Sequence, residues 1–423
     1  MPMPRTLLLA VASLSATLAA RPIAAQQPNA DVVAFGLAGN YSAAARNYDA
    51  VAWNPANLAL PGNSVASFNI AGPAVTTGSD PVGLRTIGAF NGSTIPASTK
   101  EQWLQQIGQG MERGRADGGV SILAMSVKNV ALQIGTSGYA DATLNQDAAE
   151  VLLFGNAGRT GTVRNFQFAG SSARGAAFTT GAASVGVPLP LMLTGAPDEI
   201  ITIGLTGKYV LGNAMGRAED QGSVIMPNVA SVNFPSIYGT GADLGHGVGL
   251  DAGLAWHAGN LTAGVTVQNL LNTFAWDTTK LKSRLGTASF DGTTSASNFG
   301  EQPYALAPSG MRDAVTAERF RPTIGGGLAW RPAEALLLTT DARVQTGDGI
   351  QIGPRAQVGA GLDLSVIPFL PVRIGAARIT DGWQAAAGIG LRMGDNHLGV
   401  SALVRDRGVA KETGAMVNLI AFY

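Results

Sequence analysis

Cysteine is absent from this 423-residue chain, and charged side chains make up only 13 % of it, about half the share in an average soluble domain. The lack of cysteine excludes disulfide frameworks, thiol catalysis and Cys-ligated zinc. Its 28 basic and 28 acidic residues cancel, which removes the electrostatic basis for binding nucleic acid. Beyond the N-terminus no apolar run reaches the roughly 18 residues that a membrane helix needs. Because 46 % of the residues are nevertheless apolar, the composition favours a membrane protein whose apolar side chains are spread along alternating strands.

The first residues predict export. Met1–Arg5 carry one positive charge, Thr6–Ala20 are rich in leucine and small residues, and Ile23–Gln26 offer a small-residue cleavage site. This pattern is typical of a secretory signal peptide over residues 1–25, with a tethering helix as the alternative. Export without a later membrane helix predicts the outer membrane of a Gram-negative bacterium. We expect the terminal aromatic pair, Phe422-Tyr423, to be bound by the barrel-assembly machinery.

Alternation of apolar with small or polar side chains indicates transmembrane strands, whose two faces meet lipid and lumen. In Ala356–Val366 every second residue is apolar, while Gln357, Asp363 and Ser365 fall between them. Repeated segments of this kind predict an all-β fold, an antiparallel barrel of about fourteen strands over residues 63–423. The strands are expected at 63–75, 118–128, 130–144, 174–187, 199–211, 247–257, 260–275, 319–331, 334–345, 354–366, 370–380, 383–393, 396–405 and 412–423.

Connection lengths predict the orientation of the barrel, because outer-membrane barrels have short periplasmic turns and longer extracellular loops. The short turns are at 128–130, 188–198, 257–260, 331–334, 366–370 and 393–396, and the long segments are at 76–117, 145–173, 212–246 and 276–318. Segments 82–90 and 223–232 are candidates for further strands. Aromatic residues near strand ends predict interfacial girdles, and these are Trp256, Trp276, Trp330, Trp383 and Tyr423.

Residues 26–62 are too numerous for a simple tail and are predicted to form a plug, or hatch, inside the lumen. Small residues there are interspersed with Phe35, Tyr41, Tyr48, Trp53, Asn54 and Pro55. The Asn-Pro pair favours a turn, which would lead the chain from the hatch into the first strand.

Several short motifs of this chain occur in a known family. They are Gly36–Tyr41, Asp49-Ala50, Asn54-Pro55-Ala56-Asn57-Leu58, Gly249–Gly253 followed by Gly264–Asn269, and Arg321-Pro322 leading into Gly325–Trp330. Through them the sequence resembles the FadL family of outer-membrane transporters for hydrophobic compounds, including PorV-like and uncharacterised relatives. The resemblance implies a fourteen-stranded barrel, a hatch that blocks the lumen, and sideways exit of the ligand through a gap in the wall.

Two loop segments predict short helices with apolar faces. Thr99–Arg113 places Trp103, Leu104, Ile107 and Met111 at helical spacing, and Gln146–Asn156 contributes a second apolar run. The two helices either form an extracellular groove for a hydrophobic ligand or pack against each other as a cap.

Charged residues are predicted on the inward faces of the strands, where they must be paired or hydrated. They are Lys208, Asp251, Asp341, Arg343, Arg355, Asp363, Arg373, Arg392 and Arg405. One interpretation is a salt-bridge lattice that seats the hatch. The other is a ligand site in which Arg343, Arg355, Arg373 and Arg392 bind a carboxylate, since a guanidinium grips that group bidentately.

The chain offers no enzymatic motif. Its histidines, His246, His257 and His397, belong to no metal or catalytic pattern, and neither a G-x-S-x-G nor a phosphate-binding loop occurs. We therefore expect no enzyme, cofactor or metal site. Three hypotheses stand: a passive channel for fatty-acid-like hydrophobic or amphipathic molecules, a PorV-like partner of a protein secretion system, and a closed structural barrel. The expected partners are outer-membrane lipids and a hydrophobic small molecule.

Overall fold

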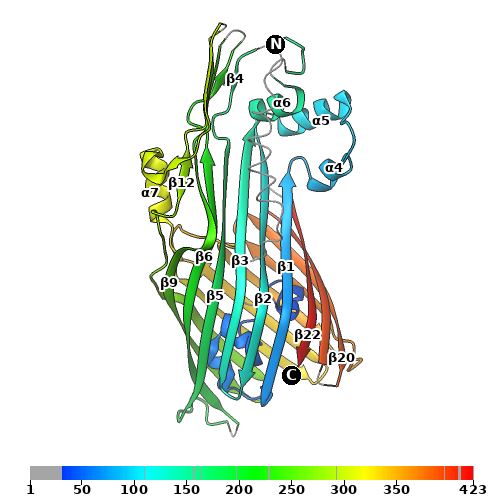
Figure 1. The fold of residues 1–423 in the computed structure, drawn as a ribbon. Helices are drawn as coiled ribbons and strands as arrows, with labels where there is room; N and C mark the ends of the chain where they lie inside the picture. Colours follow the sequence, from blue (N-terminus) through cyan, green and yellow to red (C-terminus); the bar gives the residue numbers. More distant parts are fainter. Residues whose placement is uncertain are drawn as a thin grey trace.

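Fourteen antiparallel strands close into a barrel (Figure 1). The computed structural model describes residues 31–422 except 109, 156–157, 163, 197, 227–228, 292, 395 and 408–410. The barrel strands are β1 (Ala66–Asp80), β2 (Met111–Val127), β3 (Val130–Asn145), β5 (Ser172–Leu189), β6 (Ile200–Glu219), β9 (Ser236–Ala258), β10 (Leu261–Asn272), β16 (Thr323–Ala333), β17 (Leu336–Gln345), β18 (Ala356–Leu364), β19 (Val372–Ile379), β20 (Gly382–Met393), β21 (Asn396–Asp406) and β22 (Lys411–Phe422). Each pairs with the next, and β22 pairs with β1 to close the ring. The predicted fold class is confirmed.

Side chains alternate along the strands as the sequence predicts. On β18, Val358 is 57 % exposed on the outer face, whereas its neighbour Gln357 is 4 % exposed on the inner face. Apolar residues on an outer face that lipid covers, with polar and small ones inside, account for a composition that is poor in charge.

The two ends of the barrel differ in their connections. Short turns join β2 to β3, β9 to β10, β16 to β17 and β20 to β21 at the same end, here called the short-turn end. The opposite, long-loop end carries four α-helices and a small sheet (Figure 1). This asymmetry is the one predicted from connection lengths.

Strands extend further at the long-loop end than the sequence predicts. β9 begins at Ser236 instead of 247, and β6 continues to Glu219 instead of 211. The predicted boundaries were too short because apolar alternation marks only the lipid-covered part of a strand, while backbone pairing continues above it.

The candidate extra strands do not enter the barrel. Segment 82–90 contains helix α4 (Leu84–Gly88), and segment 223–232 contributes to a separate sheet. That sheet consists of β4 (Phe166–Gln167), β7 (Val224–Ile225), β8 (Ala230–Asn233), β13 (Thr287–Phe290) and β14 (Ser295–Asn298). The loops also hold α5 (Ala97–Ile107), α6 (Gln146–Phe154), β11 (Ala275–Trp276), β12 (Lys282–Arg284), β15 (Gln302–Pro303), η3 (Tyr304–Leu306) and α7 (Ser309–Ala317). Over the described ranges, no helix combines the length and apolar character needed to cross a membrane.

Residues 31–65 are here called the N-terminal segment; residues 31–60 lie inside the barrel near the short-turn end (Figure 1). The segment comprises α2 (Val32–Gly36), η1 (Asn47–Asp49), α3 (Ala50–Trp53) and η2 (Pro55–Ala59). Its backbone rests directly on glycines of the wall: a side chain on Gly375 would overlap the carbonyl of Leu37. The predicted signal peptide, residues 1–25, and Tyr423 lie outside the described residues.

Candidate functional site

The N-terminal segment fills the short-turn end of the lumen and is hydrogen-bonded to the wall around it. Ser401 on β21 donates to the carbonyl of Val32 at 2.8 Å, and Thr202 on β6 donates to that of Ala56 at 2.9 Å. Gln357 and Gln384 both donate to the carbonyl of Ala38, at 2.9 and 2.8 Å. Wall side chains thereby satisfy backbone groups of an irregular segment that would otherwise be buried without partners.

The aromatic and turn-forming residues predicted in this segment occupy distinct places. Tyr41 and Trp53 pack edge to face with ring centroids 5.9 Å apart, and Tyr48 is fully buried against Ala124 of β2. Phe35 is half-buried beside Leu403. Asn54 caps η2, which begins at Pro55, by accepting from Ala56 N at 3.1 Å, and it donates to the carbonyl of Leu254 at 3.1 Å.

A second block of buried apolar side chains lies toward the long-loop end. Four aromatic rings meet there: Phe178 of β5, Phe274 and Trp276 from the segment after β10, and Phe320 before β16. The ring centroid of Phe178 lies 5.4, 5.5 and 5.0 Å from those of Phe274, Trp276 and Phe320, respectively. We call these four residues the aromatic cluster. Met311 and Val315 of α7 belong to the same apolar core.

The aromatic cluster depends on glycine in the wall beneath it. A side chain on Gly212 of β6 would overlap the indole ring of Trp276. The indole N–H donates to Glu318 at 2.9 Å, and burial raises the pKa of that carboxyl although the hydrogen bond lowers it. Trp276 is thus 6 % exposed inside the barrel, so its assignment to an interfacial girdle was wrong.

A small cavity of about 80 Å³ lies between the two blocks. It is lined by Lys208, which binds Asp251 at 2.7 Å and Asn269 at 2.9 Å. Beside it the pairing of β9 with β10 is interrupted: Val267 faces Ala252, but the next pair is Leu271 with Leu250. Residues 268–270 therefore form an irregularity in the wall at the level of the cavity.

The four arginines predicted to share a carboxylate do not converge. Arg343 donates to Gln357 at 2.8 Å and lies over the ring of Trp53, whereas Arg373 binds Asp363 at 2.7 Å. Arg392 and Arg373 line one small cavity beside Val32, but Arg343 and Arg355 do not belong to its lining. Arg355 is 42 % exposed and binds Asp348 in a loop, because β18 begins one residue after it; the inward placement of Arg355 was wrong.

Of the other inward charges, Asp341 accepts hydrogen bonds from Ser42 of the N-terminal segment. Arg405 joins Asp117 and Glu412 at 3.3 and 2.9 Å. Most of the predicted inward charges therefore meet either one another or the N-terminal segment.

The two loop helices pack against each other at the long-loop end. Trp103, Leu104 and Ile107 of α5 are buried in a cluster with Val82 and Ala149 of α6. Their side chains therefore do not line an open groove, and this is the packing expected of a cap. Met111 begins β2, so its placement on the helix was wrong. Asn156, the predicted end of the second helix, lies outside the described residues.

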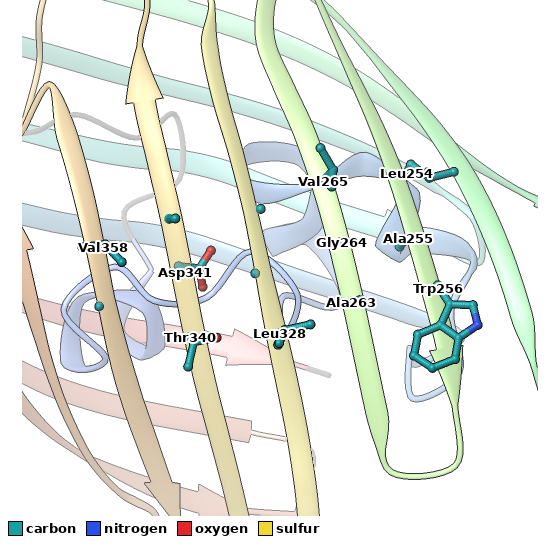
Figure 2. A pocket seen from close by; sticks show the side chains of 14 residues that line it. Leu254, Ala255, Trp256, Ala263, Gly264, Val265, Leu328, Thr340, Asp341 and Val358 are labelled. Carbon is teal, nitrogen blue, oxygen red and sulfur yellow. The ribbon is translucent and has the colours of Figure 1, made fainter.

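An apolar groove of about 470 Å³ runs over the outer face of β9, β10, β16, β17 and β18. In Figure 2, Leu254, Val265, Leu328 and Val358 border it, and the N-terminal segment lies behind the strands. Small residues such as Ala263 and Gly326 form its floor. Because the strands beneath it are paired without a break, the groove belongs to the lipid-facing surface and does not lead into the lumen.

Sequence patterns missed three members of the aromatic cluster: Phe178, Phe274 and Phe320. Phe178 carried one available signal, since it is a large ring on the inward face of a strand whose other inward residues are small. Within the described part of the chain, no three His, Asp or Glu side chains gather as a metal site would require.

Neither known protein families nor curated proteins give a match to this sequence. Solved structures do match the structure of this chain. A deltaS2 mutant of the TodX monoaromatic hydrocarbon channel superposes with a TM-score of 0.50 at 11 % identity, over 93 % of this chain and 98 % of its own. The Pseudomonas putida toluene transporter TodX has a TM-score of 0.48 at 11 % identity, and the match covers 95 % of this chain and 98 % of TodX. A Pseudomonas aeruginosa FadL homologue has a TM-score of 0.46 at 12 % identity, and the match covers 95 % of this chain and 99 % of the homologue. At this identity the likeness to the TodX mutant shows a shared barrel fold.

Proposed function

We propose that this protein is a passive outer-membrane channel for hydrophobic or amphipathic small molecules. The observation that carries the proposal is the aromatic cluster. The interior of a transmembrane barrel is ordinarily polar, yet four aromatic rings from one strand and two loop segments meet in this lumen. Aromatic and apolar side chains with a few polar groups beside them are the usual lining of a small-molecule site.

The neighbouring structure with the same architecture is a channel for monoaromatic hydrocarbons. Flat apolar molecules of that class, or the chain of a fatty acid, match the chemistry of the cluster. In the proposed route the ligand arrives from the long-loop end, replaces ring contacts within the cluster and reaches the cavity beside Lys208. It leaves either past the N-terminal segment, acting as a hatch, or sideways at residues 268–270.

Uptake measurements test the proposal. Cells lacking other channels of this kind should accumulate a labelled monoaromatic hydrocarbon or long-chain fatty acid faster when they express the protein. Trp276→Ala should change the rate several-fold, because it removes a ring from the path. Trp383→Ala, which removes a ring 46 % exposed on the outer face, is the matched control and should leave the rate unchanged.

A closed structural barrel is the second candidate, and the filling of the lumen by two separate blocks favours it. If wild-type protein at normal abundance transports nothing from a broad panel of apolar compounds, the channel proposal fails and the structural role is left.

A further inference from the structure

A polar pocket of about 390 Å³ opens inside the barrel at the long-loop end. It lies between the inner faces of β2, β3, β5 and β6 and the adjoining ends of β21 and β22. Its charged lining consists of five arginines and three carboxylates: Arg113, Arg115, Arg174, Arg217, Arg407, Asp141, Glu219 and Glu412. We call it the arginine pocket. The lining carries an excess of two positive charges.

The carboxylates of the pocket are already engaged. Asp141 binds both Arg115 at 3.3 Å and Arg174 at 3.1 Å, and Glu219 binds Arg217 at 2.5 Å. Glu412 is shared between Arg407 at 2.9 Å and Arg405, a neighbour of the pocket, also at 2.9 Å. Each carboxylate of the lining is therefore already in an ion pair with at least one arginine, and Arg115 also lies 3.6 Å from Asp117 next to the pocket.

Two guanidinium donors of the pocket are buried without an acceptor. The Nη2 groups of Arg115 and Arg407 are inaccessible to solvent and make no hydrogen bond within the described residues, whereas their Nε groups lie 3.6 Å from Asp117 and 2.9 Å from Glu412. Arg113 adds a cation to the lining that forms no ion pair in the part of the chain described. Buried charged donors without partners are costly, so the arrangement favours an anion that supplies the missing acceptors.

We propose that the arginine pocket binds a phosphate group. A phosphate monoester carries about −1.5 to −2 charges at neutral pH and three acceptor oxygens, which matches the charge excess and the separate guanidinium forks. A carboxylate would bring one charge and two oxygens, and would leave one cation unbalanced. The volume lies within the range of small-molecule sites, roughly 300–1,000 Å³, so the organic part of a phosphate ester also fits. The site is distinct from the aromatic cluster, and its ligand is independent of the proposed passage of apolar molecules.

Calorimetric titration of the full protein, in an uncharged maltoside detergent, tests this site with inorganic phosphate as the probe. Wild-type protein should bind phosphate saturably, one per chain, and more tightly than acetate. Arg115→Gln and Arg407→Gln should each weaken binding on the order of tenfold to a hundredfold, as expected for a lost charge-assisted hydrogen bond. Arg85→Gln, at an exposed position of α4 outside the pocket, is the matched control and should bind as the wild type does.

A variant that is expected to gain affinity controls for the possibility that the arginine variants lose binding through misfolding. Glu219→Gln removes the carboxylate that engages Arg217, so it should tighten phosphate binding several-fold in a barrel that is still folded. Competition then separates two sources of phosphate: displacement by phosphatidic acid in mixed micelles assigns a lipid headgroup, and displacement by glycerol 3-phosphate alone assigns a soluble ester. Absence of saturable binding, equal affinity for acetate, or equal weakening by Arg85→Gln would overturn the proposal.

Discussion

The indole N–H of Trp256, on β9, donates a hydrogen bond of 2.7 Å to the carboxylate of Glu199, at the end of the turn between β5 and β6. The same carboxylate accepts backbone N–H groups from Leu193, Thr194 and Gly195 at 2.8 to 2.9 Å. Desolvation favours the neutral acid, but these hydrogen bonds lower the pKa of Glu199 to about 2. An ionised side chain thus holds the turn in place.

Protection of this turn should depend on pH. Because the pKa of Glu199 in the folded chain lies below its ordinary value of 4.5, the ionised carboxylate stabilises the turn fully above about pH 4.5, and the effect is lost as pH falls toward 2. Hydrogen exchange at Leu193–Gly195, corrected with an unstructured peptide, should show this loss. Glu199→Gln should lack the protection throughout, whereas Glu334→Gln, on another short turn, should retain it. Unchanged protection in Glu199→Gln would contradict the assignment.

The pair formed by Asp363 and Arg373 should contribute strongly to stability, since both side chains are buried and lie 2.7 Å apart. Asp363→Ala leaves a buried guanidinium without its partner, which costs about 3–5 kcal/mol of unfolding free energy. Asp348→Ala breaks the exposed pair with Arg355 and should cost at most about 1 kcal/mol. Urea unfolding in lipid vesicles compares the two, and similar losses would refute the distinction.

The barrel could be predicted because one physical rule, lipid on one face and lumen on the other, imposes a period of two on every strand. This rule applies only to the part of a strand that lipid covers. Residues 236–246 of β9 include Gly239, Gly241 and Asp243 and show no apolar alternation, yet they pair with β6 and the segment after β10. Their strand structure depends on partners distant in sequence, which a local pattern does not reveal.

The candidate sites were less predictable for the same reason. An inward position follows from alternation, but the partner of an inward side chain depends on which segment enters the lumen. Phe274 and Trp276 lie at the end of a strand, as girdle residues do, and are buried only because the chain turns inward over Gly212 and Gly247. The arginine pocket likewise assembles side chains from six strands and their ends.

Gly375 provides a test of how the N-terminal segment is seated. Gly375→Val places a side chain where the carbonyl of Leu37 lies, so the segment must shift, and overpacking of this kind costs about 1–3 kcal/mol. Hydrogen exchange of residues 34–40 should accelerate. Gly181→Val is the matched control, because a side chain at Gly181 meets no atom within 4 Å. Equal exchange in the two variants would show that the segment does not depend on contact with β19.

Motion of the N-terminal segment can be tested by a disulfide, since the chain has no cysteine of its own. A Cβ on Gly36 would lie 2.9 Å from Oγ of Ser401, so sulfur atoms at these two positions can come within bonding distance of each other. Gly36→Cys combined with Ser401→Cys should therefore tie α2 to β21 under oxidising conditions. If ligands leave past a moving hatch, oxidation should abolish uptake of the labelled hydrocarbon and a reductant should restore it, while Ser401→Cys alone stays active. Uptake that continues through the locked barrel would exclude the hatch as the exit and leave the irregularity at residues 268–270 as the route.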